Sequence, residues 1–186
     1  MDVGRFIIRL LIGGFFIGHG TQKLLGWFGG GGPEQTGQMF ESVGLRPGRR
    51  MAVAAGATEV TGGTLIAAGL ATPFAAASLI GVMLTAIKSV HWSKGPWVTS
   101  GGYEYNAVLV AVLFTLAERG PGWISLDRAL GTERCGTRWA LFALGAGATG
   151  AALVDAAARR AEARPQRVAA EASAGQQAPE PAPAAV

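Results

Sequence analysis

Long apolar segments constrain this chain more than any other feature of its sequence. About 20 helical residues cross a bilayer core of about 30 Å. Stretches of that size or slightly shorter cover residues 6–28, 51–70, 73–92, 103–117 and 139–158. The sequence therefore predicts an all-α, polytopic membrane protein with a four-helix transmembrane bundle, a fifth transmembrane helix and a disordered C-terminal tail.

The composition agrees with a membrane protein whose helices pack closely. Charged residues make up only 15% of the chain, against about 25% in soluble domains. Glycine contributes 29 of the 186 residues, and small residues let membrane helices approach each other. Gly14 and Gly18 form a Gly-x-x-x-Gly pattern of this kind. The net charge of +4 is mostly juxtamembrane arginine, which sets topology and meets anionic lipid.

The chain divides into three parts. Residues 1–130 hold four spans, 131–160 the fifth helix, and 161–186 an Ala-, Glu-, Gln- and Pro-rich tail expected to be disordered. Between the spans we expect a short surface helix over 34–43 and an interfacial helix over 126–130. Arg9, one turn inside the first span, is expected to extend to the lipid headgroups.

Polar residues gather toward one side of the membrane. Antiparallel spans place the end of the first and third and the start of the second and fourth together. That side holds His19, Gln22, Lys23, Lys88, His91, Glu104 and Asn106. Glu59 lies eight residues into the second span, about 12 Å deep at 1.5 Å per residue. Lys23 is its expected partner, and Glu104 is the competing partner for Lys23.

This polar cluster has two interpretations. An intramembrane carboxylate with basic neighbours is a functional-site hypothesis, and it could bind a quinone carbonyl or relay protons. Alternatively, Glu59 and Lys23 are a buried pair that fixes helix register. A bis-histidine haem is disfavoured, because His19 and His91 differ in depth by about 10 Å. Cys135 is the only cysteine, so the chain has neither a CxxC pair nor a zinc cluster.

Four motifs resemble the DoxX family of small bacterial integral-membrane proteins. They are His19-Gly-Thr-Gln-Lys-Leu24, Glu59, Gly101-Gly-Tyr-Glu-Tyr105 and Gly120-Pro-Gly-Trp-Ile-Ser-Leu-Asp127. The resemblance covers roughly residues 4 to 130. It implies a four-helix core in the bacterial cytoplasmic membrane. Some relatives are subunits of quinone-linked sulfur-compound oxidation, and others are associated with membrane complexes for thiol and oxidative-stress balance.

We therefore expect a DoxX-like subunit of a membrane redox system, with quinone as the candidate cofactor. Its expected partners are the bilayer and redox-enzyme subunits, and a homo-oligomer stays open, as does catalysis by the chain itself. Two alternatives stand beside this hypothesis. One is a non-enzymatic scaffold that docks a partner. The other is a small-molecule or proton-coupled transporter. The deep Glu59 is compatible with a transporter, but the sequence has no clear inverted repeat that would support one.

Overall fold

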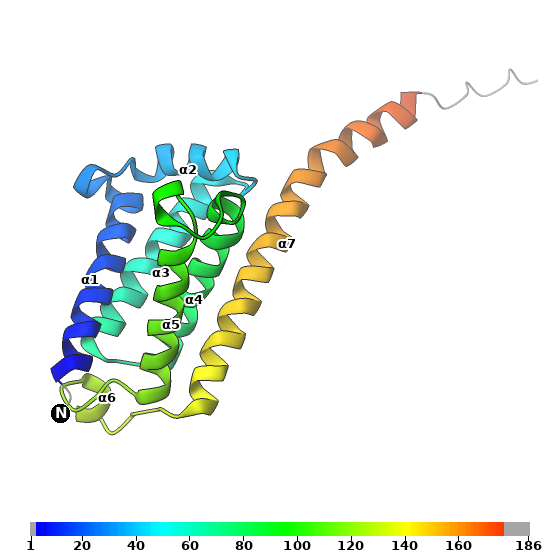
Figure 1. The fold of residues 1–186 in the computed structure, drawn as a ribbon. Coiled ribbons are helices and arrows are strands. Elements are labelled where there is room, and N and C mark those ends of the chain that lie inside the picture. Colours follow the sequence, from blue (N-terminus) through cyan, green and yellow to red (C-terminus); the bar gives the residue numbers. More distant parts are fainter. Residues whose placement is uncertain (1–2, 177–186) are drawn as a thin grey trace, which may run out of the picture.

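Five helices stand side by side in the computed structural model of the chain (Figure 1). The structure describes the backbone of residues 3–176 and the side chains of residues 3–163. Its long helices are α1 (Val3–Leu25), α3 (Gly48–Ala68), α4 (Thr72–Ala86) and α7 (Thr137–Gln176). A shorter helix, α5 (Glu104–Arg119), runs beside them. This arrangement confirms the prediction of an all-α polytopic membrane protein.

Four segments of the described chain are long and apolar enough to cross a membrane. They are Val3–Leu25, Gly48–Ala68, Thr72–Lys94 and Thr137–Ala163. The 16 residues of α5 extend about 24 Å, so α5 falls short of a full crossing by length. Its buried face, which includes Leu109, Leu113 and Leu116, nevertheless belongs to the common core. The expected fifth span, 139–158, lies within Thr137–Ala163, whereas the expected fourth span, 103–117, corresponds to α5 and is not among the four segments. Five crossings therefore stay a prediction that labelling can test.

Short elements close the two ends of the bundle. At one end lie α2 (Gly32–Ser42) and the turns η1 (Trp27–Gly29), η2 (Ile87–His91), η3 (Trp92–Lys94) and η4 (Val98–Ser100). At the other end lies α6 (Leu126–Ala129), where the Ser125 hydroxyl accepts a hydrogen bond from the Arg128 N–H at 3.3 Å. The expected surface helix and the expected interfacial helix are thus both present.

Helices α1 and α3 approach closely through glycines, of which Gly63 on α3 was expected from the Gly62-Gly63 pair in the sequence, whereas the contacting glycines of α1 were not. A Cβ atom on Gly13 would lie 2.5 Å from the Gly63 carbonyl oxygen, and one on Gly20 would lie 2.6 Å from that of Gly56. A Cβ atom on Gly14 or Gly18 would meet nothing within 4 Å. The expectation that Gly14 and Gly18 form a packing face is therefore wrong, because they point away from α3.

The side chain of Arg9 is buried and does not extend to the headgroups. It is 1% exposed, and its guanidinium donates to the carbonyl oxygens of Ile66 at 3.1 Å, Ala67 at 3.1 Å, Ile124 at 2.8 Å and Pro121. The last carbonyls of a helix lack intrahelical donors. The end of α3 therefore offers Arg9 better partners than the membrane surface does, which corrects the expectation.

Asp127 accepts hydrogen bonds at the start of α4, as Arg9 donates them at the end of α3. Its carboxylate accepts hydrogen bonds from the backbone N–H groups of Ala71 at 3.0 Å and Thr72 at 3.1 Å. The hydroxyls of Thr72 and Thr132 also donate to it. These bonds satisfy the free N–H groups at a helix start and fasten the segment after α5 beneath the α3–α4 turn.

Helix α7 packs on α4 and α5 and continues past the bundle (Figure 1). Phe74 of α4 meets Trp139 and Phe142 of α7 in edge-to-face contacts, with ring centroids 5.7 and 5.4 Å apart. Because α7 extends to Gln176, residues 161–176 are helical, although a disordered tail was expected from residue 161. Alanine, glutamate and arginine all favour helix. Residues 177–186 lie outside the described part.

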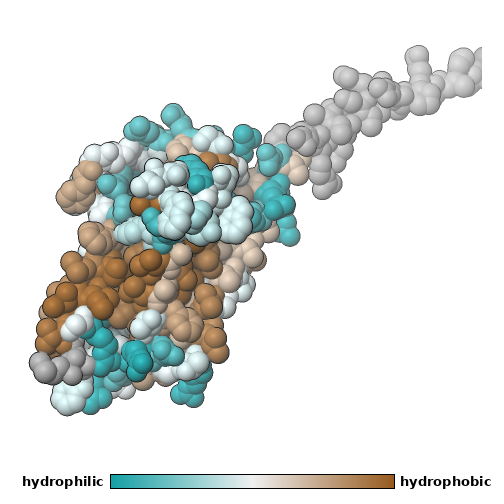
Figure 2. Space-filling model, in the orientation of Figure 1, coloured by the Kyte–Doolittle hydropathy of each residue, from teal (hydrophilic) through white to brown (hydrophobic). Residues whose placement is uncertain are grey.

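The surface of the bundle carries an apolar belt between two polar ends (Figure 2). Exposed apolar side chains on α1, such as Ile8, Leu11 and Phe15, belong to this belt. In water such a large apolar surface would be unusual, whereas lipid covers it without cost. The lipid bilayer is therefore a partner of this chain.

Candidate functional site

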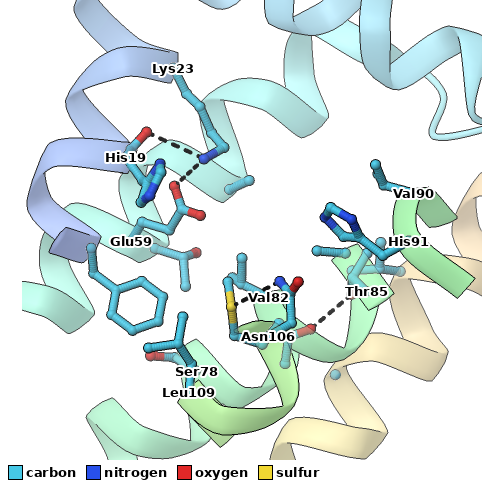
Figure 3. Close-up of a pocket in the computed structure, with 18 of the residues that line it drawn as sticks. His19, Lys23, Glu59, Ser78, Val82, Thr85, Val90, His91, Asn106 and Leu109 are labelled. Atoms are coloured by element: carbon cyan, nitrogen blue, oxygen red, sulfur yellow. Dashed lines mark hydrogen bonds and ion pairs between the residues drawn. The ribbon is translucent and has the colours of Figure 1, made fainter. Parts of the chain in front are cut away.

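An ion pair between Lys23 and Glu59 lies inside the bundle. The Lys23 ammonium nitrogen is 2.6 Å from Glu59 Oε2, and Glu59 is 2% exposed. The same nitrogen donates to the His19 carbonyl oxygen at 3.3 Å, as Figure 3 shows. The structure therefore confirms the predicted contact between Lys23 and Glu59, which was inferred from their similar depths in the membrane.

The close approach of α1 and α3 brings this pair together. Gly20 and Gly56 touch across the two helices, and Lys23 and Glu59 each lie three residues further along their own helix. Residues three apart lie on neighbouring parts of one helix face, so both side chains flank the glycine contact. Because the two helices are antiparallel, the two residues lie on opposite sides of this contact, and the long lysine side chain spans the distance to Glu59. Neither charge is then left alone in an apolar interior.

Gln22 positions His19 without lining the cavity itself. The amide nitrogen of Gln22 donates to the Phe28 carbonyl oxygen at 3.3 Å. Its amide oxygen lies 3.0 Å from His19 Nδ1, so it accepts the ring proton there. His19 is thus held over the Lys23–Glu59 pair by the turn that ends α1.

His91 and Asn106 lie across the cavity from that pair (Figure 3). His91 Nδ1 is 2.6 Å from the Gly101 carbonyl oxygen. A carbonyl only accepts, so Nδ1 carries the proton, and Nε2 of the neutral ring is an acceptor. Asn106 is buried and donates to the Met83 sulfur at 3.4 Å. His91 ends the π-helical segment η2, a local geometry that often occurs at functional sites.

A cavity of about 850 Å³ separates the two polar walls. Its lining is mainly apolar and comes from α1, α3, α4 and α5, with α2 over one end and α7 at one side. His19, Lys23, Glu59, His91 and Asn106 all line it. Small-molecule sites commonly have about this volume, about 300–1,000 Å³, with few polar groups in an apolar wall.

Contacts with the start of α3 hold α2 over the end of the cavity. Arg49 Nε donates to Glu34 Oε1 at 2.7 Å, and this hydrogen bond lowers the pKa of Glu34. The Gly48 N–H donates to Glu41 Oε1 at 2.9 Å. From the covered end, Met39 and Phe40 then line the cavity.

Two of the sequence candidates point away from the cavity. Glu104 Oε1 accepts a hydrogen bond from the Val98 N–H at 2.7 Å, so it orders the loop before α5 and does not compete for Lys23. Lys88 pairs with Asp155 of α7 at 2.7 Å. Asp155 lies near the end of the expected fifth span, on the same side as Lys88, but it was not among the sequence candidates.

Sequence reasoning also missed the apolar walls. Phe15, Met83, Tyr105 and Leu109 line the cavity, yet each is an ordinary residue of an apolar helix in the sequence. A cavity depends on the spacing of the helices, so it cannot be predicted from the type of any single residue.

Comparison with known proteins supports the motif resemblance. The DoxX family model matches residues 4–92. An uncharacterized membrane protein of Mycobacterium tuberculosis is 31% identical over 144 residues, which cover 70% of this chain and 85% of that protein. A Bacillus subtilis protein named "Putative oxidoreductase CatD" is 30% identical over 126 residues, or 68% of this chain and 86% of CatD. No solved structure matches the chain.

Proposed function

Because the chain belongs to the DoxX family of membrane proteins, we propose that it is a subunit of a membrane redox system whose cavity binds a quinone-type headgroup. The name of CatD supports the redox assignment. We place the protein in the cytoplasmic membrane of a bacterium, where redox-enzyme subunits would be its partners and supply or take the electrons.

The observation that carries this proposal is the pair of polar walls across an apolar cavity. A quinone has two acceptor carbonyls on opposite sides of an apolar ring. Lys23 has three ammonium hydrogens, and two of them face His19 and Glu59. The third is available to one carbonyl. His91 and Asn106 face the other end of such a ring from the opposite wall.

The same residues suit the reduced form of the ligand. Reduction of a quinone takes up two electrons and two protons and turns each carbonyl into a hydroxyl donor. Glu59 oxygens and His91 Nε2 are acceptors for those hydroxyls. Glu59 and His19 are also able to exchange the protons, since His19 is exposed and lies beside the pair. Lys23 and the second amide hydrogen of Asn106 thus suit the carbonyls of the oxidised form, whereas Glu59 and His91 Nε2, which only accept, suit the hydroxyls of the reduced form.

Binding of a short-tailed, water-soluble quinone to the full chain in lipid nanodiscs tests the proposal. We expect the double variant Lys23→Met with Glu59→Leu to fold and insert but to lose this binding, measured by calorimetry. Lys88→Met is the matched control, because it breaks an ion pair outside the cavity. A double variant with full membrane abundance and unchanged binding would refute the proposal. Co-purification of an enzyme without any quinone binding would favour the scaffold alternative.

A further inference from the structure

Helices α1 and α5 are joined at one end of the bundle and separated at the other. At the joined end, Arg5 Nη1 donates to the Arg119 carbonyl oxygen at 2.6 Å. Arg9 donates to Pro121 and Ile124 just beyond α5. Further along, the main neighbours of α1 are α3 and α2, while those of α5 are α4 and α7.

Helix rise gives the level of each residue above the joined end. Phe15 follows Arg5 by ten residues, and Leu109 precedes Arg119 by ten, about 15 Å in both helices at 1.5 Å per residue. By the same count, His19 and Tyr105 share a level about 21 Å from the joined end. All four of these residues line the cavity. At this depth α1 and α5 therefore form opposite sides of the cavity.

The rim of the gap faces the apolar belt. Phe15 of α1 is 54% exposed and Tyr105 of α5 is 43% exposed, although both line the cavity. Next to them, Leu11 and Val108 are exposed as well. The same face is continuously apolar below the polar end in Figure 2. Two residues that line the cavity, one from α1 and one from α5, are thus exposed on the side that lipid covers.

On its α7 side the cavity lies beside a tight contact between α7 and α4, although Ala146 on this side is exposed as well. Ala146, Gly150 and Val154 of α7 line it, but between them α7 lies directly on α4. A Cβ atom on Gly147 would be 2.7 Å from Ile80 Cγ2 and 2.8 Å from the Ala77 carbonyl oxygen. A chain of methylene groups has no room there unless α7 moves away from α4.

We propose that the gap between Phe15 and Tyr105 is a lateral portal for a lipid-tailed ligand. The occupant is a membrane-dissolved quinone with a polyprenyl tail. Its headgroup meets the Lys23–Glu59 pair, and its tail passes between α1 and α5 into the bilayer. This proposal rests on the proposed function. It adds that the ligand enters from lipid, so that neither headgroup nor tail has to cross water.

A photoreactive quinone tests the portal in the full chain in nanodiscs. The analogue carries a diazirine on the first isoprene unit of its tail, and crosslinked residues are identified by mass spectrometry. We expect crosslinks on α1 around Phe15 and on α5 around Tyr105, and their loss when excess short-tailed quinone is added. The variant Phe15→Trp with Tyr105→Trp narrows the gap and should lose the crosslink. Leu141→Trp, on an exposed position of α7, is the control and should keep it.

The outcomes separate the portal from the headgroup site. Crosslinks on Ala146, Gly150 or Val154 of α7, with short-tailed quinone still bound, would overturn the portal and leave the proposed function intact. Equal crosslinking by the narrowed variant would also overturn the portal. A wild-type protein that binds neither quinone would overturn both proposals.

Discussion

Replacing Gly20 by alanine should separate α1 from α3 and weaken the candidate site. The added Cβ atom would lie 2.6 Å from the Gly56 carbonyl oxygen and 2.6 Å from Val60 Cγ2. Ordinary contacts of this kind begin at 3.4 Å, so α3 has to move by the difference, 3.4 − 2.6, or about 0.8 Å. Overpacking of a close contact costs about 1–3 kcal/mol.

Gly18→Ala is the matched control, since a Cβ atom there meets nothing within 4 Å. This variant also replaces a flexible glycine inside a helix by alanine, which should stabilise the fold by up to about 1 kcal/mol. The two variants are therefore expected to change the free energy of unfolding in opposite directions, although they make the same chemical change two residues apart.

The assay is thermal unfolding of the purified protein in detergent, with the folded fraction at each temperature measured by size-exclusion chromatography. A loss of 1 kcal/mol lowers the Tm of a chain of this size by about 2–4 °C, so Gly20→Ala should lower it by roughly 2–12 °C. Binding of short-tailed quinone should weaken in parallel, because Lys23 and Glu59 flank the contact. A Tm that falls in Gly18→Ala and stays unchanged in Gly20→Ala would refute the packing face and restore the Gly14–Gly18 interpretation.

Three further predictions follow from the buried charges and the topology. Lys23→Met should destabilise the fold by about 3–5 kcal/mol, because Glu59 is left buried without its partner; adding Glu59→Leu should restore most of the thermal stability, and a double variant as unstable as the single one would contradict this. Arg9→Met should cost at least about 3 kcal/mol, since several buried carbonyls lose their donors, and unchanged expression and Tm would show that they find other partners. Cysteine labelling at Gln35 and Ala174, in a chain with Cys135 replaced by serine, should report the same side of the membrane if five helices cross, whereas opposite sides would reduce the crossings to four.

Depth along each helix could be predicted from the sequence, and so could the pair that depends on it. Helix rise is nearly constant, so counting residues from the membrane surface is enough to place Lys23 and Glu59 at compatible levels. Local signals were equally informative about helix ends. Pro73 marks the start of α4, and Ser125 marks that of α6.

Rotation of each helix about its axis was decided only by the tertiary structure. Gly13 and Gly20, rather than Gly14 and Gly18, face α3, and Arg9 turns inward to the end of α3. The physical reason is that several faces of an apolar helix are similar in hydrophobicity, so the packing of all neighbours together selects one. The cavity and the proposed portal between α1 and α5 depend on the same selection, because they arise where two helices do not meet.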